Sequence, residues 1–296
     1  HLDKIINANH IDITDSIKLR AELLLASCYY KDKRYNETVK IFNGINKYGE
    51  SLKTLDGAVG KYMLPIEDLK IYAISNLFSK DTDNAVIIFK ELFKIAPEES
   101  CNFMYLVANQ ILKPQQKYQE MIDILQLKLN TNVCSDENDA FCYYTIGTGY
   151  FTLNDTTKAI EALEESLKLN SKFYWSNIYL GDIYYAMKNI KASEEQFNKV
   201  IVEAQEDKEK YKHELNASFQ KKASIRLDSK KYNELEKIAK EWVNVFPENN
   251  EYGNLFLAIA YQGQQKIEQA KAAYREVLKV NKDNKTAKDN LRALGN

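Results

Sequence analysis

The chain has 296 residues, of which 45% are hydrophobic and 28% are charged, a balance typical of a folded globular protein. Its 41 Lys and Arg residues are matched by 42 Asp and Glu residues, so no net charge favours nucleic acid or an anionic membrane as a partner. No apolar run approaches the ~20 residues that a membrane-spanning helix needs.

Glycine and proline, which interrupt helices, are scarce in this chain: there are 10 Gly and 4 Pro. Several of them gather between residues 44 and 65, and long stretches elsewhere contain no such breaker. We therefore expect an all-α fold. The chain begins at His1 rather than Met, which is typical of a processed or trimmed chain, so an exported or periplasmic location and a cytoplasmic one both stay open.

The first three predicted helical segments carry a weak pattern of small and aromatic residues. They cover residues 19–50, 66–99 and 102–136. The first and second are separated by an irregular insertion at 46–65, which predicts a long loop or a short irregular helix. Loops of this length are often functional, but an insertion without a role is an equal alternative.

A repeat of about 34 residues becomes clear in the second half of the chain. Residues 140–171 align with 174–205, and 251–282 carry the same pattern. Residues 34 positions apart in the first two segments are Gly147 and Gly181, Tyr150 and Tyr184, Ala159 and Ser193, and Leu163 and Phe197. On these residues the chain resembles the tetratricopeptide repeat family, and the resemblance covers nearly its whole length.

This resemblance implies a right-handed superhelical solenoid of antiparallel helix pairs, in which the small residue at the eighth position lies where two helices cross. We expect a single array over 1–296, with six or seven repeats and a C-terminal capping helix at 284–295. The repeats start near residues 19, 66, 102, 140, 174, 216 and 251.

The repeat that starts near 216 is irregular. Lys222 and Arg226 occupy positions that should be apolar, so its helix register is uncertain. Eight extra residues precede it, roughly two helical turns, and we interpret them as a lengthened, charge-rich second helix that projects from the array.

The sequence offers little for catalysis or metal binding. The three histidines, His1, His10 and His213, lie far apart in the chain and share no metal-binding spacing. The two glycines of Gly147-x-Gly149 fall inside a repeat helix, where a nucleotide-binding loop is not expected. We predict a non-enzymatic protein with no cofactor and no metal.

Cys134 and Cys142 flank a polar turn, and we consider a disulfide between them, which would require an oxidising compartment. Four cysteines without a tight framework equally suit a reducing cytoplasm. Cys28 is expected to be a buried, inert thiol.

The first helix of each repeat also predicts a binding surface. Positions two, five, nine and twelve form one stripe of a helix with 3.6 residues per turn. The resemblance implies that this stripe lines a concave groove that binds a peptide or a partner segment. In the three strong repeats the stripe is Phe141, Tyr144, Thr148 and Phe151; Trp175, Ile178, Asp182 and Tyr185; and Tyr252, Leu255, Ile259 and Gln262.

The leading hypothesis is therefore a protein-interaction scaffold or adaptor with an aromatic-rich groove. In one alternative, neighbouring repeats cover these aromatic side chains. In another, the chain is a structural component that self-assembles or joins a larger envelope or secretion complex. The Lys, Asn and Arg clamp that some family members use for chaperone tails is absent, because its positions hold Thr145, Thr148, Tyr179 and Asp182. The sequence leaves the oligomeric state open.

Overall fold

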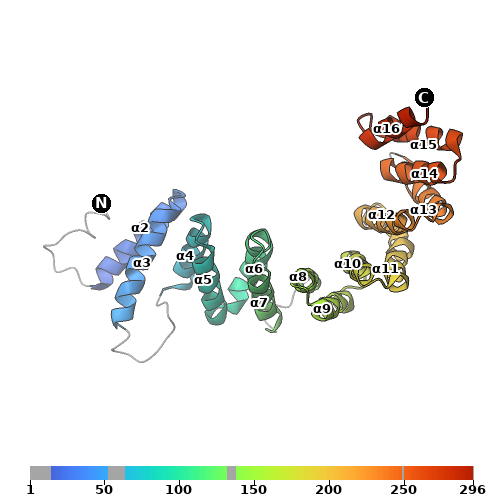
Figure 1. Ribbon diagram of the computed structural model, residues 1–296. Helices are drawn as coiled ribbons and strands as arrows, with labels where there is room; N and C mark the ends of the chain where they lie inside the picture. The colour runs from blue at the N-terminus through green and yellow to red at the C-terminus, as the bar shows by residue number, and fades with distance from the viewer. Residues whose placement is uncertain (1–14, 53–63, 132–137, 249, 296) are drawn as a thin grey trace. The chain divides into compact units, whose positions relative to one another are not determined.

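The computed structural model describes residues 15–52, 64–131, 138–248 and 250–295, and Figure 1 shows the order of its helices. Within these residues the chain is all-α, without a strand. The α-helices are α2 (Asp15–Lys31), α3 (Tyr35–Leu52), α4 (Ile66–Phe78), α5 (Thr82–Ile95), α6 (Pro97–Val107), α7 (Tyr118–Leu129), α8 (Asp139–Thr152), α9 (Thr156–Leu169), α10 (Tyr174–Ala186), α11 (Ile190–Glu203), α12 (Lys212–Asp228), α13 (Tyr232–Val245), α14 (Glu251–Gly263), α15 (Ile267–Val280) and α16 (Lys285–Ala293). A π-helical turn, η1 (Ala108–Leu112), follows α6, and a 3-10 turn, η2 (Ala204–Asp207), follows α11.

The same tight turn recurs at seven places in the described chain. Its left-handed residue has a positive φ and is never glycine: Lys33, Lys80, Gln116, Asn154, Lys188, Lys230 and Gln265. Each is the fifteenth residue counted from one of the seven expected repeat starts. In each turn the following N–H bonds to a carbonyl five residues back, as Asn189 N does to Tyr184 O at 2.9 Å. The irregular repeat near 216 therefore shares this turn and its register with the other six.

The eighth position of the repeat requires a small residue, as the sequence suggests. A Cβ atom added to Gly181 would lie 2.5 Å from the ring of Phe197, which is fully buried on the second helix of the same repeat. Close packing leaves no space for that atom. Gly181 and Phe197 thus fix how closely α10 and α11 approach each other.

The described chain divides into two units, which we call the N-terminal unit (residues 1–149) and the C-terminal unit (residues 150–296). The boundary falls inside α8. Each unit has its own packing and is described by itself. A single array over 1–296 stays a prediction.

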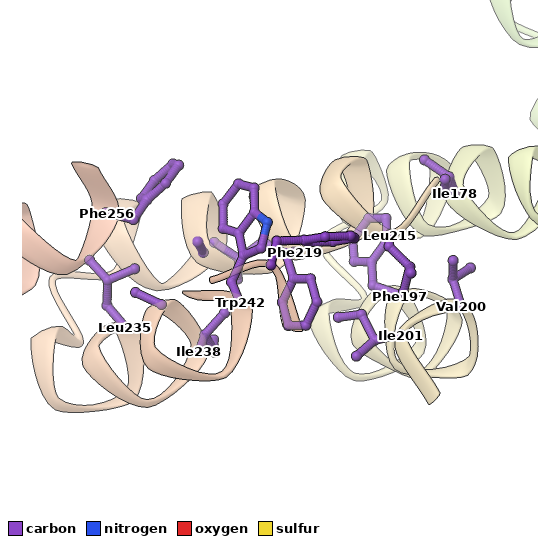
Figure 2. Close-up of a cluster of buried hydrophobic side chains, with 14 of the residues drawn as sticks. Ile178, Phe197, Val200, Ile201, Leu215, Phe219, Leu235, Ile238, Trp242 and Phe256 are labelled. Carbon is purple, nitrogen blue, oxygen red and sulfur yellow. The ribbon is translucent and has the colours of Figure 1, made fainter. Parts of the chain in front are cut away.

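The main core of the C-terminal unit is built around Trp242 (Figure 2). Its ring stacks on Phe219 at a centroid distance of 5.8 Å, and Phe256 lies on the cluster at 6.0 Å from Trp242. The indole N–H donates to Asn216 Oδ1 at 2.7 Å. A buried indole with a bonded N–H stabilises the fold through both its area and its polar contact.

The C-terminal end is closed by α16, which lies within the segment 284–295 where we expected a capping helix. Ala287 and Leu291 are buried against α14 and α15. Asn284 caps the helix by accepting from Ala287 N at 2.9 Å. Its amide also donates to Glu251 Oε1 at 2.7 Å, which ties α16 to α14.

The extra residues before the repeat near 216 do not form a projecting helix, so that expectation is wrong. The helix α11 ends at Glu203, and the chain continues through η2 to α12. Ala204 is buried, and the ring of Tyr211 meets Tyr174 edge-on at 4.8 Å. Because these two side chains pack on the core, the segment folds back rather than extending into solvent.

The insertion at 46–65 is partly helical, because α3 continues to Leu52. Residues 53–63 lie outside the described residues. In the N-terminal unit, Lys128 of α7 is buried and its Nζ lies 2.7 Å from Asp139 Oδ1 at the start of α8. This ion pair joins the second helix of one repeat to the first helix of the next.

Candidate functional site

The expected stripe on α10 is only partly at the surface. Trp175 is 37% exposed and Tyr185 is 38% exposed, whereas Ile178 is 4% exposed. Ile178 belongs to the core cluster of Figure 2, together with Leu215 and Phe219 of α12. The prediction of a groove position is therefore wrong for Ile178, because this side chain is buried in the core cluster.

Two polar contacts link the stripe of α10 to α12. Lys221 Nζ lies 2.8 Å from Asp182 Oδ2, and Tyr185 donates its hydroxyl proton to Asp228 Oδ2 at 3.0 Å. That hydrogen bond raises the pKa of Tyr185. The carboxylate of Asp182 is thus already paired, while the Tyr185 ring keeps an exposed face.

On α14 the expected stripe residues also differ in how exposed they are. Tyr252 is 52% exposed. Leu255 and Ile259 are half-buried and pack against the cluster closed by α16. Gln262 accepts from the hydroxyl of Tyr274 at 2.6 Å, and burial raises the pKa of Tyr274 to about 12. Of the four, Tyr252 presents the largest free surface.

On α8 the stripe begins in the N-terminal unit, where two aromatic rings cluster with one from α6. Phe141 meets Tyr105 edge-on at 5.5 Å and lies 5.8 Å from Tyr144. Lys113 Nζ lies 6.0 Å from the Tyr144 ring, and burial lowers the pKa of Lys113. Thr148 is buried and donates to Thr145 O at 2.8 Å, so Thr148 is not a groove residue.

The last stripe residue of α8 lies in the C-terminal unit. Phe151 is half-buried and meets Tyr179 of α10 edge-on at 6.0 Å. Phe151, Trp175, Tyr185 and Tyr252 are the aromatic members of the stripe in this unit, and we call them the aromatic stripe.

The N-terminal unit contains a groove that the sequence analysis did not assign. Its volume is about 510 Å³, and it lies among α4, α5, α6 and η1. The lining is apolar except for two glutamines: Ile74, Leu77, Phe78, Phe89, Phe103, Leu106, Val107, Gln110, Ile111, Pro114 and Gln115. The stripe rule gives eight residues in the repeats that start at 66 and 102, and five of them line the groove: Ile74, Leu77, Phe103, Leu106 and Gln110. The sequence of these weaker repeats therefore contained part of the signal.

One edge of this groove has an irregular backbone. At η1 the Lys113 N–H donates to Ala108 O, five residues back, at 3.0 Å. The next residue is Pro114, which has no N–H to give. Single π turns of this kind often occur at functional sites.

The described residues contain no group of three or more His, Cys, Asp or Glu side chains that could hold a metal ion. His213 is exposed, and His1 and His10 lie outside the described residues. Among the described helices, none has the length and apolar character needed to cross a membrane.

The expected disulfide is not supported. Cys142 is a buried thiol in α8, and its proposed partner Cys134 lies outside the described residues. Cys101, which the sequence analysis did not single out, is in a disulfide. Cys28 is exposed, so the expectation that it is buried is wrong.

Two segments of the chain, residues 142–173 and 253–284, match the sequence model of the tetratricopeptide repeat. The chain therefore contains tetratricopeptide repeats. These two segments coincide with two of the three repeats that carry the strongest sequence pattern.

Solved structures with this fold are also similar. The apo form of RapI matches with a TM-score of 0.58 and 13% identity, over 93% of this chain and 80% of that one. The C-terminal part of a TPR repeat-containing protein from Cytophaga hutchinsonii gives 0.47 and 15%, over 98% and 92%. A tetratricopeptide repeat protein from Parabacteroides merdae gives 0.44 and 12%, over 94% and 99%. At these identities the likeness to RapI shows the fold alone. No curated protein sequence matches the chain significantly.

Proposed function

We propose that this tetratricopeptide-repeat protein is a non-enzymatic scaffold that binds a protein segment through the aromatic stripe of its C-terminal unit. The observation that carries the proposal is the exposure of Trp175, Tyr185 and Tyr252, three large aromatic side chains at stripe positions of α10 and α14. Solenoids of this family present extended surfaces to partners.

Large aromatic side chains are the usual anchors of protein interfaces, because they bury much apolar area with little loss of side-chain entropy. Trp175 and Tyr185 lie on a helix that is anchored in the core through its buried residues Tyr174 and Ile178. Their backbone positions are therefore rigid before a partner binds. Preorganisation of this kind lowers the cost of binding.

Two carboxylates lie beside the stripe. Asp182 is paired with Lys221, whereas Asp228 accepts from the uncharged hydroxyl of Tyr185 and keeps its negative charge. This arrangement favours an apolar partner segment with few acidic residues. Rim charges of this type affect specificity and association rate more than affinity.

The test compares two neighbouring residues of α10. The protein is expressed with an affinity tag in its natural cells, and the proteins that bind it are quantified by mass spectrometry. Trp175→Ala should weaken binding of the natural partner by ~2 kcal/mol or more while leaving the protein folded. Tyr174→Ala, which removes a buried ring, is the control and should destabilise the fold.

The proposal fails if Trp175→Ala binds the same partners with unchanged affinity per folded molecule. Equal unfolding by Trp175→Ala and Tyr174→Ala would show that the stripe is part of the core. Light scattering on the intact chain separates partner binding from self-assembly, because a scaffold of this kind has no need to form large homo-oligomers.

A further inference from the structure

Lys113 is a half-buried lysine directly after η1, and the proposed binding function does not use it. Its backbone N–H bonds to Ala108 O at 3.0 Å, and the next residue is Pro114, whose ring locks its own φ angle. The base of the side chain is therefore held in place. Its Nζ lies 6.0 Å from the centre of the Tyr144 ring on α8.

Within the described residues, no carboxylate pairs with this ammonium group, and its side-chain contact is the cation–π contact with Tyr144. Several other lysines lie over tyrosine rings and also pair with a carboxylate: Lys158, Lys240 and Lys266. Lys210 lies over the Tyr211 ring without a carboxylate, but it is exposed. Lys113 differs from both kinds of lysine, since it is half-buried and unpaired.

The surroundings of Lys113 favour a neutral amine. Burial lowers the pKa of Lys113, and no charged neighbour contributes to that shift. A hydrogen bond to a carboxylate has the opposite effect and raises the pKa of three exposed lysines: Lys158, Lys168 and Lys240. Only the neutral amine has the free electron pair that attacks an electrophile. Lys113 is therefore better prepared for such a reaction than the paired lysines.

We propose that Lys113 is an acylation site, whose neutral amine reacts with an acyl thioester. The nitrogen attacks the carbonyl carbon of the thioester, a C–N bond forms and the C–S bond breaks. The sulfur leaves as a thiolate and takes up the proton that the nitrogen loses, so the products are an amide and a thiol. A small acyl donor can approach the side chain, because the residue is half-buried rather than enclosed.

Acylation also changes the energy of this position. It removes the positive charge of the side chain. The folded protein then no longer holds an unpaired ammonium ion partly out of water, which is costly. The site goes beyond the proposed binding surface, since Lys113 and Tyr144 belong to the N-terminal unit.

The first experiment treats the folded, full-length chain with a small acetyl thioester, S-acetyl-N-acetylcysteamine, at neutral pH. Digestion and mass spectrometry give the acetylation rate of each lysine, so the lysines of one molecule are compared directly. Lys113 should react about threefold faster or more than Lys210, and also faster than Lys117, which pairs with Asp83. In guanidinium chloride, where the fold is lost, the three rates should become similar.

The second experiment tests the missing carboxylate with Asn109→Asp. Residue 109 lies four residues before Lys113, the spacing at which an acid and a lysine pair along a helix. The new charge should raise the pKa of Lys113 and slow its acetylation by about tenfold, with the rate of Lys210 unchanged. Asp keeps the size of Asn and the oxygen that accepts from Thr145 at 3.2 Å.

Asn36→Asp is the matched control, because it adds the same charge at an exposed residue of the first repeat and should leave the rate of Lys113 unchanged. Circular dichroism verifies that both variants are folded. A Lys113 rate no higher than those of Lys210 and Lys117 would reject the proposal, and this comparison needs no variant. An unchanged Lys113 rate in folded Asn109→Asp would reject it too. So would rates that stay equally different in guanidinium chloride, because the local sequence would then explain them.

Discussion

The fifth stripe position behaves differently in the two units. In the C-terminal unit, Ile178 of α10 is buried in a core cluster that also contains Leu215 and Phe219 of α12. In the N-terminal unit, Leu106 of α6 stands at the same position and lines an open groove. The same rule of helical periodicity therefore gives a core residue in one unit and a surface residue in the other. The two positions differ in whether neighbouring side chains cover them.

Both units have an apolar core, and the N-terminal unit also has a buried ion pair between successive repeats. The C-terminal unit has a continuous aromatic and aliphatic cluster around Trp242. The N-terminal unit places a buried ion pair, Lys128 with Asp139, between successive repeats. A buried ion pair gives less net stability than an apolar contact of the same size, but it is costly to break.

The largest effect is expected from Trp242, and Trp175 of the same unit is the comparison. Trp242→Ala should lower the free energy of unfolding by about 3–5 kcal/mol, because it leaves a cavity in the core and removes the hydrogen bond to Asn216. Trp175→Ala should cost much less, since its side chain is exposed. Urea denaturation followed by circular dichroism measures both. Equal losses would contradict the division between core and stripe.

The ion pair of the N-terminal unit comes next. Asp139→Asn should destabilise the protein by about 3 kcal/mol, because it removes a carboxylate that pairs with the buried Lys128 ammonium. Adding Lys128→Met in the same chain should recover part of this loss, which a double-mutant cycle in urea resolves. If Asp139→Asn and Trp175→Ala cost the same small amount, the pair does not hold the repeats together.

The smallest effect concerns pH and the C-terminal unit. Glu236 of α13 accepts from Lys240 Nζ at 2.6 Å and from Lys266 Nζ and Gln264 Nε2 at 2.9 Å. The bond from Lys240 contributes most to lowering the pKa of Glu236 to about 2. A carboxyl whose pKa falls on folding stabilises the protein above its unfolded pKa of 4.5, and this contribution is lost as the pH falls toward 2.

Urea denaturation at several pH values between neutral and about pH 2 tests this contribution by comparing wild type with Glu236→Gln. The stability difference between the two proteins should shrink as the pH falls through that window. The stability of Asp139→Asn, a variant of the N-terminal unit, is measured at the same pH values for comparison. A constant difference at all pH values would show that Glu236 acts through packing rather than charge.

Helical periodicity predicted some parts of the site and could not predict others. It placed Trp175, Tyr185 and Tyr252 on one face, and all three are exposed. It put Ile178 and Thr148 on the same face, and both are buried. The angle of a residue around its own helix follows from the sequence spacing. Whether neighbouring side chains bury a residue on that face depends on residues elsewhere in the chain.

The repeat itself was determined by the sequence alone. Small residues at the eighth position and paired aromatic residues 34 apart recur because each helix pair must bury the same faces against the same kind of neighbour. Those contacts are local, so the sequence spacing alone is enough to assign Gly181 and Phe197 to their positions in the repeat. Only the tertiary structure decided that the groove is open and that Ile178 is buried. Each depends on how closely neighbouring repeats pack against each other. That packing is set by many side chains together.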